Sequence, residues 1–171
     1  MNQDQFWDII GRACRSDLHK ADDWARNLEI ELKRFAPDEI VEWNHIFDRL
    51  AFRARTVDLW GAAYTINGGA SDDGFYYFQC WLIGMGKQVY ETAVANPDRL
   101  ADVLDPQVDA QAEIYAAAHQ AWMAVTGRRD TDPYPARKEY SDQPVPGEDW
   151  DFDDAEEVHR RLPRLASIYL K

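Results

Sequence analysis

The chain has 171 residues, of which 46% are hydrophobic and 13% aromatic, and its formal net charge is -12. A chain of this length suits one domain, and its apolar content is too high for an intrinsically disordered protein. The acidic balance disfavours direct contact with DNA or RNA, because their phosphates bind lysine and arginine. It is compatible with a basic protein partner, and equally with a surface that serves solubility alone.

The N-terminal sequence MNQDQFWDII has no basic region followed by a long apolar run, so we expect no signal peptide. No apolar run approaches the roughly 18 residues of a membrane-spanning helix. Cys14 and Cys80 each lie among apolar residues of a predicted helix, which favours buried free thiols over a disulfide or a zinc site. These features predict a cytoplasmic protein without a cofactor and without membrane contact.

Apolar residues recur at steps of three and four along most of the chain, which is the spacing of amphipathic helices. In the first third of the chain this spacing predicts helices at residues 3–15, 20–35 and 37–64. The last of these is predicted as one long helix or as two helices with a small kink, with Thr56 and Gly61 as the weak points.

A glycine-rich connection and a strongly apolar helix follow. The run Asn-Gly-Gly at 67–69 is expected to end the preceding helix, because glycine adopts the left-handed conformation without steric cost. Ser71 is the predicted N-cap of a helix at 72–84, with Asp72 and Asp73 in its first turn. Because this helix is apolar on nearly all sides, we expect it to be the buried central helix.

The second half begins with further helical spacing. Helices are predicted at residues 87–95, 97–104 and 106–126. Prolines then interrupt the pattern, so residues 128–150 are predicted to form an extended segment that wraps the surface. Residues 153–170 are expected to be helical and to dock back. The predicted fold class is therefore all-α, a single compact multi-helix domain that spans residues 1–171.

The first candidate site is the turn formed by Ser71, Asp72 and Asp73. Two acids at the start of a buried helix could hold a divalent cation through their oxygens, or bind an arginine of a partner. Alternatively, Ser71 caps the helix and the two acids complement the helix dipole. Asp58, beside the apolar stripe of its own helix, could face this turn and complete a metal site.

Other candidates remain open. Asp58 could instead pair with Arg53 or Arg55, or reach solvent. The four histidines are scattered without metal-ligand spacing, which leaves His45 and His119 as candidate general bases.

An acidic run forms a third candidate. Residues 141–157 contain eight acids and no lysine or arginine. Such a run is either a solvated segment or a surface that mimics an anion and engages a basic partner.

Several motifs resemble a bacterial family known as domain of unknown function 4240. They are LWGAAY at 59–64, GG-x-SDDGF at 68–75 and YF-x-x-WLI at 77–83, with FW-x-II near the start, NPD-x-L at 96–100 and LPRL at 162–165. The resemblance spans most of the chain, and it implies no established activity. Position by position, it marks residues that either bind something or hold the fold: Trp60, Tyr64, Gly68, Gly69, Ser71, Asp72, Asp73, Phe75, Phe78 and Trp81.

Two functions are compatible with the sequence. The first is a non-catalytic protein-binding or regulatory module of the bacterial cytoplasm, such as an inhibitor or immunity-type partner of a basic protein. The second is a small metal-assisted hydrolase in which Asp72, Asp73 and Asp58 hold a cation that activates water. The acidic charge and the missing nucleophile-elbow, phosphate-loop and zinc-protease motifs favour the first, so we do not expect an enzyme.

Overall fold

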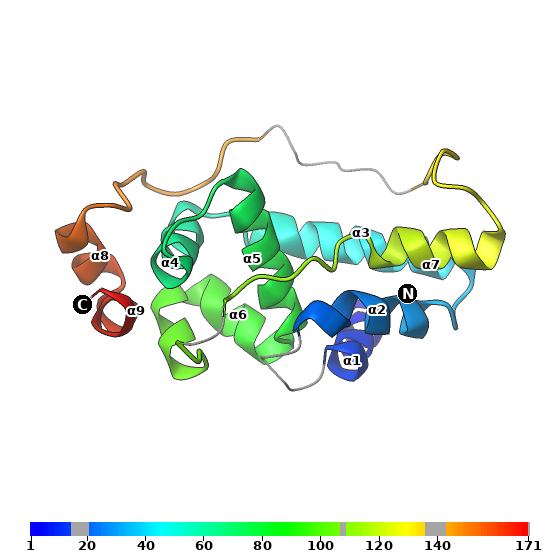
Figure 1. The fold of residues 1–171 in the computed structure, drawn as a ribbon, viewed down its shortest axis with the longest axis horizontal. Coiled ribbons are helices and arrows are strands. Elements are labelled where there is room, and N and C mark those ends of the chain that lie inside the picture. The colour runs from blue at the N-terminus through cyan, green and yellow to red at the C-terminus, as the bar shows by residue number, and fades with distance from the viewer. Residues whose placement is uncertain (15–20, 107–108, 136–142, 171) are drawn as a thin grey trace.

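The computed structural model describes residues 1–14, 21–106, 109–135 and 143–170. Every regular element in these ranges is a helix, which confirms the predicted all-α class (Figure 1). The elements are α1 (Gln3–Ala13), α2 (Ala21–Leu32), α3 (Pro37–Arg53), α4 (Val57–Asn67), α5 (Asp72–Gly84), α6 (Lys87–Ala95), the 3-10 helix η2 (Pro97–Asp102), α7 (Ala117–Thr126), α8 (Ala155–Arg161) and α9 (Pro163–Tyr169). None of these helices is long and apolar enough to cross a membrane.

Helix α5 occupies the centre of the fold, as predicted. It packs against α1, α3, α4 and α6 (Figure 1). The side chains of Phe75, Phe78 and Trp81 are at most 3% exposed. Neighbouring helices each add a buried tryptophan to the same core, namely Trp7, Trp24, Trp43 and Trp122.

Both cysteines are buried free thiols, as predicted. Burial raises the pKa of the Cys14 thiol to about 12, because the thiolate would lose its hydration. Cys80 is fully buried on the central helix. Neither sulfur is therefore placed to act as an exposed nucleophile.

The long helix predicted at 37–64 is two helices. Helix α3 ends at Arg53, and the Thr56 hydroxyl caps α4 by accepting a hydrogen bond from the backbone N–H of Leu59 at 3.3 Å. Gly61, the other predicted weak point, lies buried inside α4 without interrupting it.

The helix predicted from 106 to 126 is wrong over residues 109–114, while residues 107 and 108 lie outside the described ranges. Only α7 is helical, and residues 109–114 are extended. This extended piece crosses α5 (Figure 1), where the backbone N–H of Ala112 donates to the carbonyl of Tyr77 at 3.1 Å. The side chain of Asn67 forms two hydrogen bonds with the backbone of Ala110. These bonds satisfy backbone groups that a helix would have used internally.

The C-terminal part docks back on the domain, as predicted. Residues 143–154, which we call the strap, run extended over the surface (Figure 1), and α8 and α9 then pack on α4 and η2. Asp98 accepts hydrogen bonds at 3.0 Å from the first free backbone N–H groups of α9, at Arg164 and Leu165. The predicted extended segment also includes residues 136–142, which lie outside the described ranges.

Candidate functional site

The predicted turn at the start of α5 has the geometry of a helix junction. Gly68 ends α4 in the left-handed conformation, with a φ of 66°. The Ser71 hydroxyl accepts a hydrogen bond from the backbone N–H of Gly74 at 3.2 Å, so Ser71 is the N-cap. Asp72 and Asp73 occupy the first turn with exposed side chains. The cap predicted from the sequence is present, and both acids face solvent.

Trp60 fixes this turn against α4. Its indole N–H donates to the carbonyl of Ala70 at 2.9 Å, directly before the cap. Its ring stacks on Phe75 with a centroid distance of 5.0 Å and an interplanar angle of 10°. These residues of the motifs at 59–64 and 68–75 therefore hold one another in place between two helices.

Asp58 does not join Asp72 and Asp73. It accepts a hydrogen bond from the Trp150 indole at 3.2 Å and pairs with Arg161 at 3.6 Å, whereas Arg53 pairs with Glu91. Among the described residues, no group of three or more His, Cys, Asp or Glu side chains could hold a metal ion. The hypothesis of a metal-assisted reaction thus gains no support from the placement of these acids.

The strap lies directly on α4. Its Pro146 carbonyl accepts a hydrogen bond at 3.0 Å from the backbone N–H of Val57, one of the unpaired N–H groups that every helix has at its first turn. Farther along, the Trp150 ring covers Gly61 so closely that a Cβ there would overlap it. At the strap's beginning, Arg55 donates to the carbonyl of Gln143.

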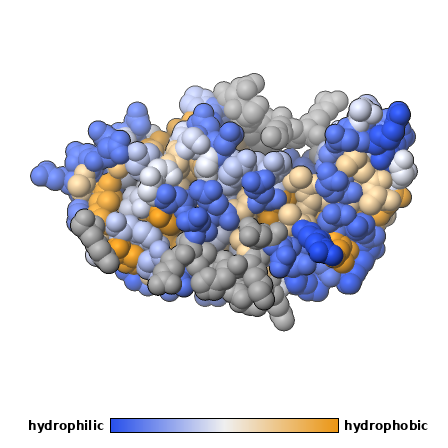
Figure 2. All heavy atoms as spheres, in the orientation of Figure 1, coloured by the Kyte–Doolittle hydropathy of each residue, from blue (hydrophilic) through white to orange (hydrophobic). Residues whose placement is uncertain are grey.

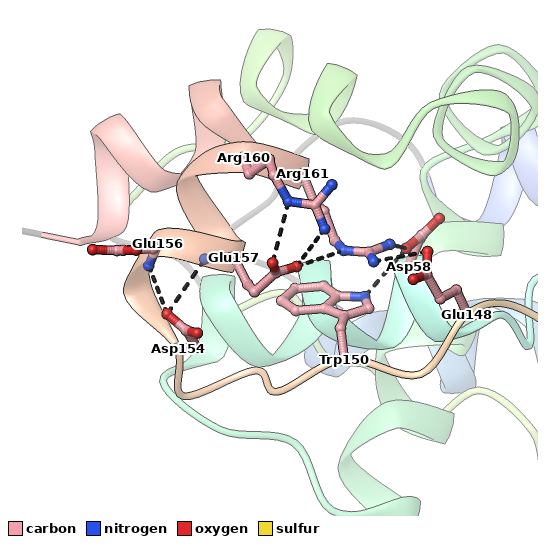
Figure 3. Close-up of polar contacts among 8 residues, drawn as sticks. All are labelled: Asp58, Glu148, Trp150, Asp154, Glu156, Glu157, Arg160 and Arg161. Atoms are coloured by element: carbon pink, nitrogen blue, oxygen red, sulfur yellow. Dashed lines mark hydrogen bonds and ion pairs between the residues drawn. The ribbon is translucent and has the colours of Figure 1, made fainter.

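Arg161 of α8 fastens the strap through charge (Figure 3). Its guanidinium pairs with Glu148 at 3.0 Å and with Glu157 at 3.1 Å, in addition to the contact with Asp58. It also lies over the Trp150 ring, 5.4 Å from the centroid, a distance typical of a cation–π contact. One side chain, only 15% exposed, thus connects the strap, α4 and α8.

Tyr64 joins the last part of the strap to α4. Its hydroxyl donates to Asp153 at 2.7 Å, and this bond to a carboxylate raises the pKa of Tyr64 above its ordinary value. The ring of Phe152 packs between Tyr64 and Trp60, with centroid distances of 5.7 and 6.3 Å. Trp60 and Tyr64, both from the motif at 59–64, therefore contact the strap.

Most strap acids form no ion pair with a described basic residue. Within the described residues, Glu148 and Glu157 form ion pairs, but five other acids in the strap and α8 form none: Asp149, Asp151, Asp153, Asp154 and Glu156. Figure 2 shows hydrophilic residues beside hydrophobic ones at the end of the molecule where α8 lies. The strap therefore packs on the fold and also carries several acids that form no ion pair with a described residue.

The candidate histidines do not assemble a catalytic group. His45 lies 3.7 Å from Glu42 of its own helix. His119 packs against Tyr134 and Trp122, and its Nδ1 lies 3.9 Å from Asp130. Contacts of this kind are those of ordinary partly buried side chains.

Sequence reasoning does not single out three residues of the site: Arg161, Trp150 and Phe152. The acidic run was recognised, yet nothing in its spacing indicates which basic residue holds it. One signal is present in the sequence: Trp150, like Phe152, is a large aromatic residue in an acidic run, and a tryptophan in such a run usually has a packing partner. The partner itself, Gly61, lies 89 residues earlier and could not be inferred from local pattern.

Comparison with known proteins bears on the first 125 residues. The family described as "Protein of unknown function (DUF4240)" matches residues 1–125, which include α1 to η2 and most of α7. No curated protein and no solved structure matches the chain. The strap, α8 and α9 follow the matched region. Since the match covers well over half of the sequence, the chain belongs to the DUF4240 family of proteins of unknown function.

Proposed function

We propose that this protein is a non-catalytic binding module that engages a basic segment of another protein through its strap. A bacterial cytoplasmic regulator or inhibitor that covers the basic surface of its target is the form that we favour. The binding surface would consist of the outward-facing strap acids and the start of α8.

The observation that carries the proposal is an acidic segment held in a fixed position while most of its carboxylates form no ion pair within the described part of the chain. Pro146, Trp150 and Phe152 fix the strap to α4. Its aspartates, in contrast, form no ion pair with any described lysine or arginine. Ordered charges of one sign favour encounter with an opposite charge and lose little side-chain entropy on binding.

The turn at the start of α5 would extend this surface. Trp60 contacts both the turn, through Ala70, and the strap, through Phe152. Trp60 thus connects the turn that carries the exposed acids Asp72 and Asp73 with the strap. In this proposal Trp60, Tyr64, Gly68, Gly69, Ser71 and Phe75 hold the acidic groups in position.

The test is binding of a fluorescently labelled basic peptide, ten residues long with alternating arginine and glycine, measured by anisotropy at low and physiological salt. In one variant Asp149, Asp151, Asp153 and Asp154 are all changed to Asn, which keeps side-chain oxygens for the bond from Tyr64 and for the cap of α8. We expect its affinity to fall by at least about tenfold, equivalent to about 1.4 kcal/mol.

A matched control changes four exposed aspartates elsewhere to Asn: Asp8, Asp23, Asp38 and Asp109. Both variants alter the net charge by the same amount, so the control should lose less than about threefold in affinity. Equal losses in the two variants would mean that only net charge attracts the peptide. That result, or no binding by the wild type at low salt, would contradict the proposal.

A further inference from the structure

An open pocket of about 430 Å³ lies between α4 and the strap. Its walls come from both elements: Val57, Trp60, Val145, Gly147, Asp149 and Phe152. Two aromatic residues and one aspartate thus border the same space. Gly147, one of its lining residues, has a φ of 129° and lies so close to Val57 that a Cβ there would meet the Val57 side chain at 3.0 Å.

The aromatic part of the pocket is rigid. Trp60 stacks on Phe75 and donates its N–H to Ala70, so its ring has a fixed orientation. Phe152 lies against Trp60 at a tilt of 49° and against Trp150 at 74°, with a centroid distance of 4.7 Å to the latter. A planar cation entering the pocket would find ring faces that need no rearrangement.

The charge of the pocket is negative and uncompensated. Glu148, next to Asp149, is already paired with Arg161, but Asp149 has no ion pair among the described residues. Ring faces carry negative electrostatic potential and add to the carboxylate. An anion would be repelled by both features and a neutral group would gain no charge attraction, whereas a cation is favoured by both.

The same surface already contains an example of this chemistry. Arg161 lies over the Trp150 ring while its guanidinium pairs with carboxylates on either side. The pocket offers an equivalent set from Trp60, Phe152 and Asp149, with no cation of the described chain in it.

We propose that this pocket receives an arginine side chain of the basic partner, with the guanidinium against Trp60 and Phe152 and paired with Asp149. Arginine suits the site better than lysine, because its planar group stacks on aromatic rings and binds a carboxylate through two N–H groups. This inference rests on the proposed function and adds to it a specific anchor point.

The decisive comparison is between Asp149→Asn and Asp151→Asn, two single changes of equal charge on the same strap. Asp151 does not line the pocket, and its side chain accepts a bond from the backbone N–H of Asp153, which Asn can still accept. With the arginine–glycine peptide, Asp149→Asn should weaken binding by about fivefold or more, and Asp151→Asn by less than about twofold. A lysine–glycine peptide of equal length should bind the wild type at least about threefold more weakly.

A second measurement locates the peptide. The ¹⁵N–¹H NMR spectrum contains a signal for each indole N–H, and the Trp60 signal is assigned from its loss in Trp60→Phe. This signal should shift on addition of the arginine peptide. A shift confined to the Trp150 signal would mean that the peptide displaces the strap, and would overturn the pocket assignment.

The two proposals fail in different ways. If both single variants weaken binding equally, or arginine and lysine peptides bind equally well, the pocket inference is wrong while an acidic binding surface still stands. If the wild type binds neither peptide, both proposals fall together.

Discussion

At the scale of single residues, Gly61 determines how the strap lies. Its missing side chain leaves room on α4 for the Trp150 ring, which then reaches Asp58 and Arg161. Glycine in a helix interior lowers helix stability by about 1 kcal/mol relative to alanine, so its presence here needs a compensating contact. The packed indole is that contact.

Gly61→Leu should therefore destabilise the protein in spite of leucine's better helix propensity. We expect the free energy of unfolding in urea to fall by about 1–3 kcal/mol, the usual result of overpacking. A protease specific for glutamate should also cleave faster after Glu148, because the strap loses its contact with α4.

Gly11→Leu provides the control, since Gly11 lies in α1 with nothing near the position of an added Cβ. That variant should be as stable as the wild type or more so. If Gly61→Leu behaved in the same way, the strap would not depend on the contact between Trp150 and α4.

At the scale of elements, α8 holds the strap by charge. Glu157 pairs with Arg160 and Arg161, and these hydrogen bonds lower the pKa of Glu157 below its ordinary value. Because the folded pKa is depressed, the stabilising effect is present above the unfolded pKa and is lost as the pH falls through the folded one. Acid should thus weaken these pairs within α8, one of which involves the Arg161 side chain that also pairs with the strap.

Glu157→Gln should lower the urea midpoint at pH 7 and reduce the loss of stability between pH 7 and about pH 3.5, since one titrating group is removed. Glu156→Gln is the matched neighbour, because Glu156 is exposed and forms no ion pair among the described residues. Its pH dependence should equal that of the wild type. Identical pH profiles for Glu157→Gln and the wild type would show that these ion pairs do not stabilise the fold.

The elements also show how far sequence reasoning reaches. The Asn-Gly-Gly run correctly predicts the end of α4, and Ser71 correctly predicts the start of α5, because these signals are local. The segment 109–114 was mistaken for helix although its residues alternate, with Ala110, Ala112 and Ile114 buried and the residues between them exposed. Alanine is a strong helix former, so the sequence favours a helix here in spite of the alternation, which is typical of an extended segment.

Only the local features of the candidate site could be predicted from the sequence, for a related reason. The acidic run and the cap at Ser71 depend on neighbours in sequence, so the sequence indicates them directly. The position of the strap depends on Gly61 and Arg161, which are distant from it or in another helix. No local sequence pattern indicates such a long-range contact.

At the scale of the whole molecule, the C-terminal helices belong to the main core although the family match ends at residue 125. Val158, Leu162 and Leu165 are at most 2% exposed, and they join the core cluster that includes α4 and η2. The strap, α8 and α9 should therefore unfold together with the rest of the chain.

Leu165→Ala should lower the free energy of unfolding by about 2–5 kcal/mol, as loss of a buried leucine does. Tryptophan fluorescence and far-ultraviolet circular dichroism should still report one coincident transition. Leu170→Ala, at a position 37% exposed, should cost far less. Two separate transitions in the Leu165 variant would identify the C-terminal helices as an independently unfolding unit.

The long separation between the strap and its support has a consequence for synthesis on the ribosome. The bond from Tyr64 to Asp153 joins residues 89 positions apart, and α9 follows later still. At about 5–20 residues per second, roughly 5 to 20 s pass between the appearance of α4 and that of its cover. During this interval the face that carries Trp60 and Gly61 is open on the nascent chain, so chaperones have their best access to this protein before its last helices emerge.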